Sequence, residues 1–138
     1  MSTVTGGCFC GAVRYAITGE PKSVGICHCE SCRRIAGAES VAWAVIPLAV
    51  FAITAGEPCA FNSSPGVTRM HCERCATSLT YRVEGRELID VTLGSLDDAE
   101  TWIPGQEVFC AEAVSWNALG PSNEHFAEGS SGPKFEAG

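Results

Sequence analysis

Residues 7–11 read Gly7-Cys8-Phe9-Cys10-Gly11, and a second close pair of cysteines follows in the stretch Cys72-Glu73-Arg74-Cys75. Such spacings let neighbouring sulfurs reach the same metal ion at about 2.3 Å. We predict that Cys8, Cys10, Cys72 and Cys75 share one zinc ion, because four thiolates close its tetrahedral coordination. An ion of this kind ties distant parts of a chain together, and its apparent binding energy of roughly 10–16 kcal/mol rivals the stability of a whole domain. The two pairs therefore predict a structural zinc site.

A third cluster, Cys27-His28-Cys29-Glu30-Ser31-Cys32, contributes three more thiols. A zinc ion held by Cys27, Cys29 and Cys32 alone keeps one position for water or substrate, as catalytic zinc sites do. Thiolate ligands make this a soft site that favours an incoming thiol, and coordination lowers the pKa of that thiol. The cluster, which we expect in a loop between strands, predicts the addition of a thiol to a carbonyl group.

Two arginines and two histidines adjoin the cysteines. Arg33 and Arg34 are predicted to hold a carboxylate of an anionic thiol by paired hydrogen bonds, with an ordinary solvated face as the alternative. His28 and His71 are each next to a cysteine, and either one could complete a Cys3His site. A closed second site would remove the exchangeable position, and the spacing alone leaves both arrangements open.

The nine cysteines favour metal binding over disulfide bonds. Their number is odd, and the N-terminus lacks the charged start and apolar run of a signal peptide. We therefore expect a cytoplasmic protein, in which thiols stay reduced. Cys59 and Cys110 stand alone and are predicted to be small buried residues.

The net charge of −7 narrows the expected partners. An acidic surface repels phosphate backbones, so no nucleic-acid partner is expected. No apolar run approaches the roughly 18 residues of a membrane helix, and no membrane partner is expected either. The remaining expectation is a small-molecule thiol together with a small carbonyl compound.

Short alternating apolar runs predict a mainly β fold with little helix. The predicted strands cover residues 12–17, 40–46, 49–54, 79–83, 87–93 and 109–116, with a hairpin turn at Glu84-Gly85. The length predicts a single domain over residues 1–138. Its core is expected at about residues 6–121, and residues 122–138 form a tail rich in small residues that we expect to be loosely docked.

Three stretches carry a family resemblance. In chain order they are Gly7-Cys8-Phe9-Cys10-Gly11-Ala12-Val13-Arg14-Tyr15, Cys27-His28-Cys29-Glu30-Ser31-Cys32-Arg33-Arg34 and Arg69-Met70-His71-Cys72-Glu73-Arg74-Cys75. Together they resemble the glutathione-dependent formaldehyde-activating enzyme (GFA) family, which is related to centromere protein V. The resemblance covers about residues 6–121. The chain departs from the family pattern at His71, usually phenylalanine, and at Ala76, usually glycine; alanine in a left-handed turn costs about 1 kcal/mol or more.

The resemblance implies a β-tent-like fold of antiparallel sheets stapled by zinc. It also implies two Zn²⁺ ions per chain, a structural ion on the first four cysteines and an open catalytic ion on Cys27, Cys29 and Cys32. The implied activity is that of a carbon–sulfur lyase, joining glutathione or a related thiol to formaldehyde or another small aldehyde to give S-hydroxymethylglutathione. Two further interpretations are a zinc-stabilised binding or scaffold module without catalysis, and a metal-storage or redox-sensing protein that uses exposed thiolates.

Overall fold

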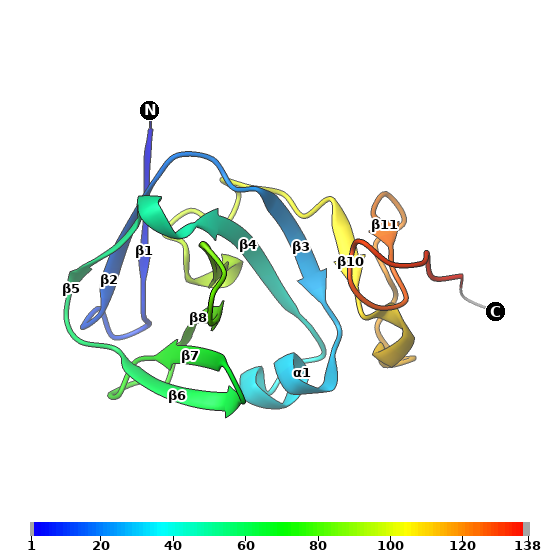
Figure 1. Ribbon diagram of the computed structural model, residues 1–138, viewed down its shortest axis with the longest axis horizontal. Helices are drawn as coiled ribbons and strands as arrows, with labels where there is room; N and C mark the ends of the chain where they lie inside the picture. The colour runs from blue at the N-terminus through cyan, green and yellow to red at the C-terminus, as the bar shows by residue number, and fades with distance from the viewer. Residues whose placement is uncertain (1, 137–138) are drawn as a thin grey trace. The chain divides into compact units, whose positions relative to one another are not determined.

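This computed structural model describes residues 2–136 (Figure 1). Within them lie eleven strands, one α-helix and three short 3-10 helices, joined by turns and loops. The chain divides into two compact units. The first unit comprises residues up to 23 and residues 44–102, and the second comprises residues 24–43 and those from 103 onward. The mainly β fold with little helix that the sequence predicts is confirmed.

The first unit begins with an antiparallel sheet of β1 (Thr3–Gly7), β2 (Arg14–Thr18) and β5 (Phe51–Ala55). Gly7 pairs with Arg14, so residues 8–13 form the connection at the end of the β1–β2 hairpin. Along β2 the side chains alternate, and Tyr15 and Ile17 are buried while Thr18 is exposed. This alternation is what a strand with one face on the core requires.

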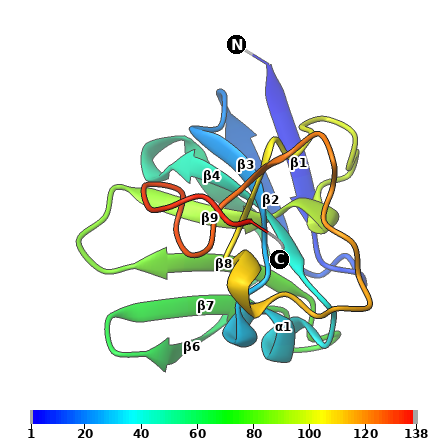
Figure 2. The same cartoon turned by 90° about the vertical axis from the view of Figure 1, so that its right-hand side faces the viewer.

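Four more strands of the first unit form an antiparallel meander, which Figure 2 shows as successive ribbons. They are β6 (Cys59–Ser64), β7 (Val67–His71), β8 (Ser78–Val83) and β9 (Leu88–Thr92). The segment between β7 and β8 carries Cys72 and Cys75. Leu79 and Val91 are fully buried and belong to the hydrophobic core of this unit.

A buried hydroxyl network links two segments of the first unit. Tyr15 and Ser95 share a hydrogen bond of 2.7 Å, and the Thr92 hydroxyl donates to Ser95 Oγ at 2.8 Å. Ser95 lies in a 3-10 helix at Leu93–Ser95. Because buried hydroxyls need partners, this network fixes the segment that follows β9 against β2.

The second unit contains β3 (Ser23–Cys27), which begins at the last residue of the first unit, together with β10 (Gln106–Val108) and β11 (Glu124–His125). Strand β10 is parallel to both β3 and β11. The unit also holds the helix α1 (Glu30–Ala36) and a 3-10 helix at Cys110–Glu112. Strand β4 (Val41–Pro47) starts in this unit and ends in the first, where a 3-10 helix at Leu48–Val50 follows it.

Most predicted strands match observed ones, and two expectations are wrong. Residues 109–116 are not a strand, because Phe109 adopts a left-handed conformation (φ 54) that ends β10 and begins the 3-10 helix. The third cysteine cluster does not lie in a loop, since Cys32 is part of α1. The single-domain organisation stays a prediction. So does the loose docking of residues 122–138, although Phe126 N donates to Glu107 O at 2.9 Å and its side chain is buried.

Candidate metal centres

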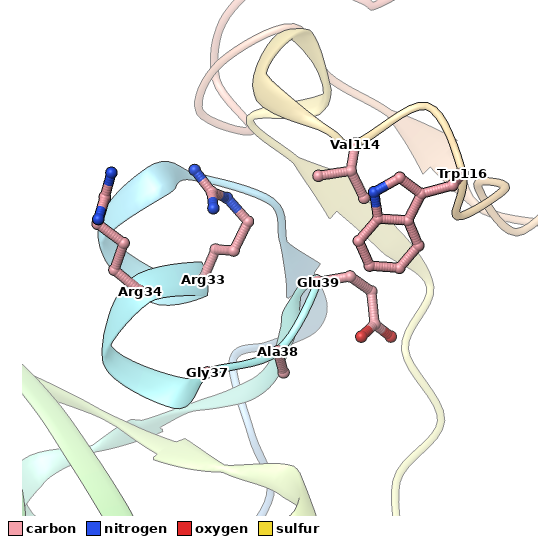
Figure 3. Close-up of a pocket in the computed structure, with 7 residues that line it drawn as sticks. All are labelled: Arg33, Arg34, Gly37, Ala38, Glu39, Val114 and Trp116. Atoms are coloured by element: carbon pink, nitrogen blue, oxygen red, sulfur yellow. The ribbon is translucent and has the colours of Figure 1, made fainter.

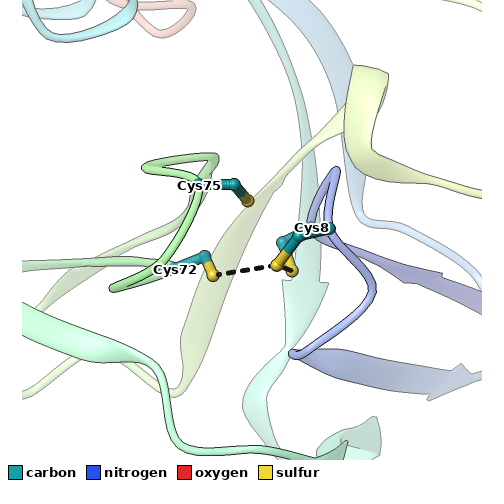
Figure 4. A group of neighbouring side chains, drawn as sticks. Cys8, Cys72 and Cys75 are labelled. Atoms are coloured by element: carbon teal, nitrogen blue, oxygen red, sulfur yellow. Dashed lines mark hydrogen bonds between the residues drawn. The ribbon is translucent and has the colours of Figure 1, made fainter.

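Four cysteine sulfurs of the first unit converge between two turns (Figure 4). Cys8 and Cys10 come from the β1–β2 connection, and Cys72 and Cys75 come from the turn between β7 and β8. The sulfurs all lie within 4.8 Å of one another. The Sγ atoms of Cys8 and Cys10 are 3.6 Å apart, and those of Cys10 and Cys72 are 3.7 Å apart.

Backbone geometry at both turns brings these sulfurs together. Cys8 N and Val13 O close the first turn at 3.0 Å, and Cys72 N and Thr77 O close the second at 3.0 Å. Gly11 and Ala76 adopt positive φ values of 81 and 63, which lets the chain reverse tightly after each pair. Cys8 and Cys10 therefore lie in a turn between β1 and β2.

The donor set of this four-cysteine group fits zinc. Four sulfurs placed tetrahedrally at about 2.3 Å from one ion are about 3.8 Å apart, close to the separations found here. Val13 N donates to Cys8 Sγ at 3.2 Å, as amides around thiolates do. Hydrogen bonding by Thr77 lowers the pKa of Cys75 to about 5. The backbone of Ala12 lowers the pKa of Cys10, but burial and the neighbouring thiols outweigh it and raise that pKa to about 11. Ionisation of all four thiols therefore needs a compensating cation.

A three-cysteine group lies within the second unit. Cys27 ends β3, Cys29 is the N-cap of α1, and Cys32 lies in the first turn of the helix. The three sulfurs lie within 4.8 Å of one another. Cys32 N donates to Cys29 Sγ at 3.3 Å, so the cap sulfur satisfies an amide of the helix start that would otherwise lack a partner. The Cys29 side chain thus caps the helix and also lies where it could bind a metal ion.

The neighbouring thiols Cys29 and Cys32, together with burial, hold the pKa of Cys27 well above its ordinary value. Three thiolates crowded in a buried place repel one another, so they cannot all ionise without a compensating cation. A Zn²⁺ ion provides that compensation and keeps its thiol ligands deprotonated. This group also fits zinc, with three protein donors.

Neither histidine next to a cysteine joins a metal group among residues 2–136. His28 is 1% exposed, and its Nε2 lies 2.7 Å from Glu107 Oε1. His71 lies in β7 with its ring 5.8 Å from the ring of Phe61. The alternative of a Cys3His site, which the sequence leaves open, finds no support in this geometry. Cys59 and Cys110 also lie outside both groups, and Cys110 is buried.

A pocket of about 540 Å³ lies along α1, and its lining includes Arg33, the residue after Cys32 in the chain (Figure 3). Its lining residues are Arg33, Arg34, Gly37, Ala38, Glu39, Val114 and Trp116. The side chain of Trp116 is 74% exposed. Arg34 pairs with Glu30 at 3.0 Å, one helical turn before it, whereas no ion pair engages Arg33 among the described residues. A volume of this size suits a small organic ligand.

Several residues of the second unit were not predicted from the sequence. Glu107 is hydrogen-bonded to His28, and Glu112 Oε1 accepts a hydrogen bond from Glu30 N at 3.0 Å. Glu39 and Trp116 line the pocket. None of these four residues stands at a regular spacing from the cysteines of the three-cysteine group, so the sequence gives no pattern that connects them to it. The available signal for Glu107 was a glutamate directly before the apolar run Val108-Phe109-Cys110, because a carboxylate on a buried strand requires partners.

The fold and the two cysteine groups fit a mainly β, zinc-binding type of domain. The family model described as "Glutathione-dependent formaldehyde-activating enzyme" matches residues 3–112, and the chain belongs to this family. No curated protein matches the chain. The chain is similar to the crystal structure of a Rhodobacter sphaeroides protein determined as a structural genomics target, with a TM-score of 0.59 and 19% identity. That match covers 72% of this chain and 97% of the other and supports the fold alone.

The helices of this chain are short. Within residues 2–136 no helix combines the length and the hydrophobicity needed to cross a bilayer.

Proposed function

We propose that the chain catalyses the addition of a small anionic thiol, such as glutathione, to formaldehyde or another small aldehyde at the three-cysteine group. In this reaction the S–H bond breaks, a carbon–sulfur bond forms, and the thiol proton ends on the former carbonyl oxygen. One observation carries the proposal. Among the described residues, the second unit gathers three sulfurs without a fourth cysteine, histidine or carboxylate donor, and Arg33 and Arg34, which follow Cys32 in the chain, line a pocket.

The proposed roles follow from the residues present. Cys27, Cys29 and Cys32 would hold the zinc ion, whereas Cys8, Cys10, Cys72 and Cys75 would hold a structural one. When bound by three thiolates, zinc supplies an exchangeable position and a lowered pKa for a thiol ligand.

The pocket along α1 would supply binding energy for the thiol. Arg33 has a guanidinium without an ion-pair partner among the described residues, so it is the better placed of the two arginines to bind a carboxylate. Trp116 and Val114 provide an apolar wall for the carbon chain of the thiol, and Glu39 adds a carboxylate that suits an ammonium group. Figure 3 shows Arg33 between Arg34 and Trp116 in the view given.

Cobalt substitution tests the thiol site directly. Replacing zinc by Co²⁺ should give sulfur-to-metal absorption bands that shift when glutathione is added, and Cys29→Ser should abolish the shift. Turnover is followed by NMR exchange between free and adduct-bound formaldehyde. If the cobalt absorption bands do not shift when a thiol is added, the catalytic proposal fails. A zinc-stabilised binding module then becomes the better interpretation.

Two arginine variants test the carboxylate-binding role. Arg33→Gln should weaken the binding of 3-mercaptopropionate about tenfold or more, because a hydrogen bond to a charged group contributes about 1.5–3 kcal/mol. Binding of uncharged 2-mercaptoethanol should not change. Arg34→Gln is the matched control, since its guanidinium already pairs with Glu30, and should have a smaller effect. Equal losses for both thiols would contradict a carboxylate-binding role for Arg33.

A further inference from the structure

The backbone around the three-cysteine group places His28 behind it. Cys27 ends a strand, and Cys29 keeps an extended conformation with φ −65 and ψ 153. Side chains of an extended chain point alternately to opposite sides, so His28 points away from the side on which Cys27 and Cys29 lie. The imidazole is 1% exposed and therefore lies in the interior of the second unit.

Glu107, in the neighbouring strand β10, is the hydrogen-bond partner of this imidazole. The parallel register pairs Glu107 with Ile26, and His28 follows two residues later, just after the end of β3, where its N donates to Val108 O at 3.0 Å. Glu107 is 2% exposed, and its Oε1 lies 2.7 Å from His28 Nε2. The other oxygen, Oε2, accepts hydrogen bonds from Gly120 N at 2.7 Å and from Asn123 Nδ2 at 2.9 Å.

These partners determine the charge of the carboxyl. Burial opposes ionisation, but the hydrogen bonds from Asn123, His28 and Gly120 outweigh it and hold the pKa of Glu107 below its ordinary value. An ionised carboxylate only accepts hydrogen bonds, so the proton on the imidazole lies at Nε2. His28 Nδ1 is buried and has no hydrogen-bond partner among residues 2–136. The bond to Glu107 is therefore what orients this ring.

We infer that Glu107 is a positioning residue for the three-cysteine group. It anchors His28 on one side of the extended segment, so that Cys27 and Cys29 are presented to the metal on the other side and His28 stays off the metal. Gly120 and Asn123 hold Glu107 in turn, which makes the segment that follows the 3-10 helix at Cys110–Glu112 part of the support of the site. The inference rests on the proposed metal site, but not on the proposed reaction.

Glu107→Gln tests this role with little change in shape. The amide oxygen of glutamine can keep the bonds from Gly120 and Asn123, and its NH2 group then faces His28 Nε2, which must become an acceptor. NMR of the zinc-loaded full-length protein with ¹⁵N-labelled histidine should show His28 protonated at Nε2 in the wild type and at Nδ1 in Glu107→Gln. Zinc should also leave the three-cysteine group about tenfold faster or more, because supporting hydrogen bonds of this kind tune metal affinity by about 10–100-fold.

Zinc release to a colorimetric chelator provides the second readout without any substrate. The phase that belongs to the three-cysteine group is identified by its loss in Cys29→Ser, and release from the four-cysteine group should not change in Glu107→Gln. Glu124→Gln is the matched control, since it removes a surface carboxylate paired with Lys134 in the same unit. Asn123→Ala, a milder change, should accelerate the same phase by a smaller factor.

The outcomes separate this inference from the reaction. Accelerated release of one zinc together with the change of tautomer supports it, even in a protein that shows no turnover of thiol and aldehyde. Equal acceleration at both groups would indicate general destabilisation and overturn it. Unchanged release in both Glu107→Gln and Asn123→Ala would also overturn it.

Discussion

Ala76 adopts a left-handed backbone conformation directly after the second cysteine of the β7–β8 turn, with φ 63. A side chain with a Cβ atom is strained there by roughly 1–2 kcal/mol, and glycine is not. Glycine also raises the entropy of the unfolded chain, which offsets part of this gain. We therefore expect Ala76→Gly to increase the free energy of unfolding of the zinc-loaded protein by about 0.5–1 kcal/mol, as measured by urea denaturation.

Ala52 provides the control for this prediction. It is an exposed residue within β5, where glycine has no conformational advantage. Ala52→Gly should therefore lower the stability by about 0.5–1 kcal/mol. If both substitutions destabilise the protein equally, the strain assigned to Ala76 is wrong.

At the residue scale, the sequence identifies side chains whose chemistry depends on local spacing. The three cysteine clusters are visible because the members of each lie within a few residues of one another, whereas Ala76 is noticed only as a departure from the family pattern. Glu107 is not, since its partner His28 is distant along the chain and only the parallel pairing of β3 and β10 brings them together. Long-range polar contacts of single residues leave no periodic signal.

At the element scale, β9 carries a half-buried carboxylate with an incomplete set of partners among the described residues. Burial raises the pKa of Asp90 to about 6, against the weaker opposing effects of Arg86 and Arg69. Asp90 Oδ1 is buried and has no hydrogen-bond partner among the described residues. Because the pKa in the folded state exceeds the unfolded value of about 3.9, the penalty is absent below about pH 4 and complete above about pH 6.

Asp90→Asn should therefore stabilise the protein at neutral pH, by an amount on the order of 2–3 kcal/mol. The difference in unfolding free energy between variant and wild type should grow as the pH rises from about 4 to about 6 and then stay level. Urea denaturation at several pH values measures it. Asp98→Asn is the control, since Asp98 is exposed and its Oδ1 accepts from Glu100 N, a role that asparagine can fill. A pH-independent difference for Asp90→Asn would contradict the assignment.

The bounds of strands β2, β4, β8 and β9 lie within two residues of the predicted ones. Strands β2 and β9 bury alternate apolar residues, which is the pattern of a half-buried strand, whereas β4 buries the neighbours Trp43 and Ala44. Helix α1 was missed because its seven residues are too short for a helical period to show. The predicted strand at residues 109–116 is absent because the left-handed Phe109 turns the chain, and no sequence rule assigns that conformation to phenylalanine.

At the scale of the whole molecule, the two cysteine groups belong to different compact units. The four-cysteine group joins two turns that are more than sixty positions apart, as the 62-residue separation of Cys10 and Cys72 shows. The three-cysteine group is local, since its members lie within one strand end and one helix turn. Loss of the first ion therefore releases long-range structure, whereas loss of the second releases only a short segment.

Replacing one cysteine in each group should therefore affect folding differently, although each replacement should remove one zinc ion. Cys72→Ser should remove one zinc ion and abolish cooperative folding of the first unit, because structural zinc contributes roughly as much energy as a domain's whole stability. Cys29→Ser should also lower the zinc content by one ion but keep the far-UV circular dichroism and a cooperative thermal transition, while losing the cobalt response to thiols. Zinc content, circular dichroism and calorimetry measured on the same samples check both variants.

A titration of the wild type with a chelator should agree with these results. One zinc ion should leave before any loss of structure, and the second should leave together with unfolding. If both substitutions unfold the protein, or if both ions leave in one step, the division between a structural and an open site is wrong.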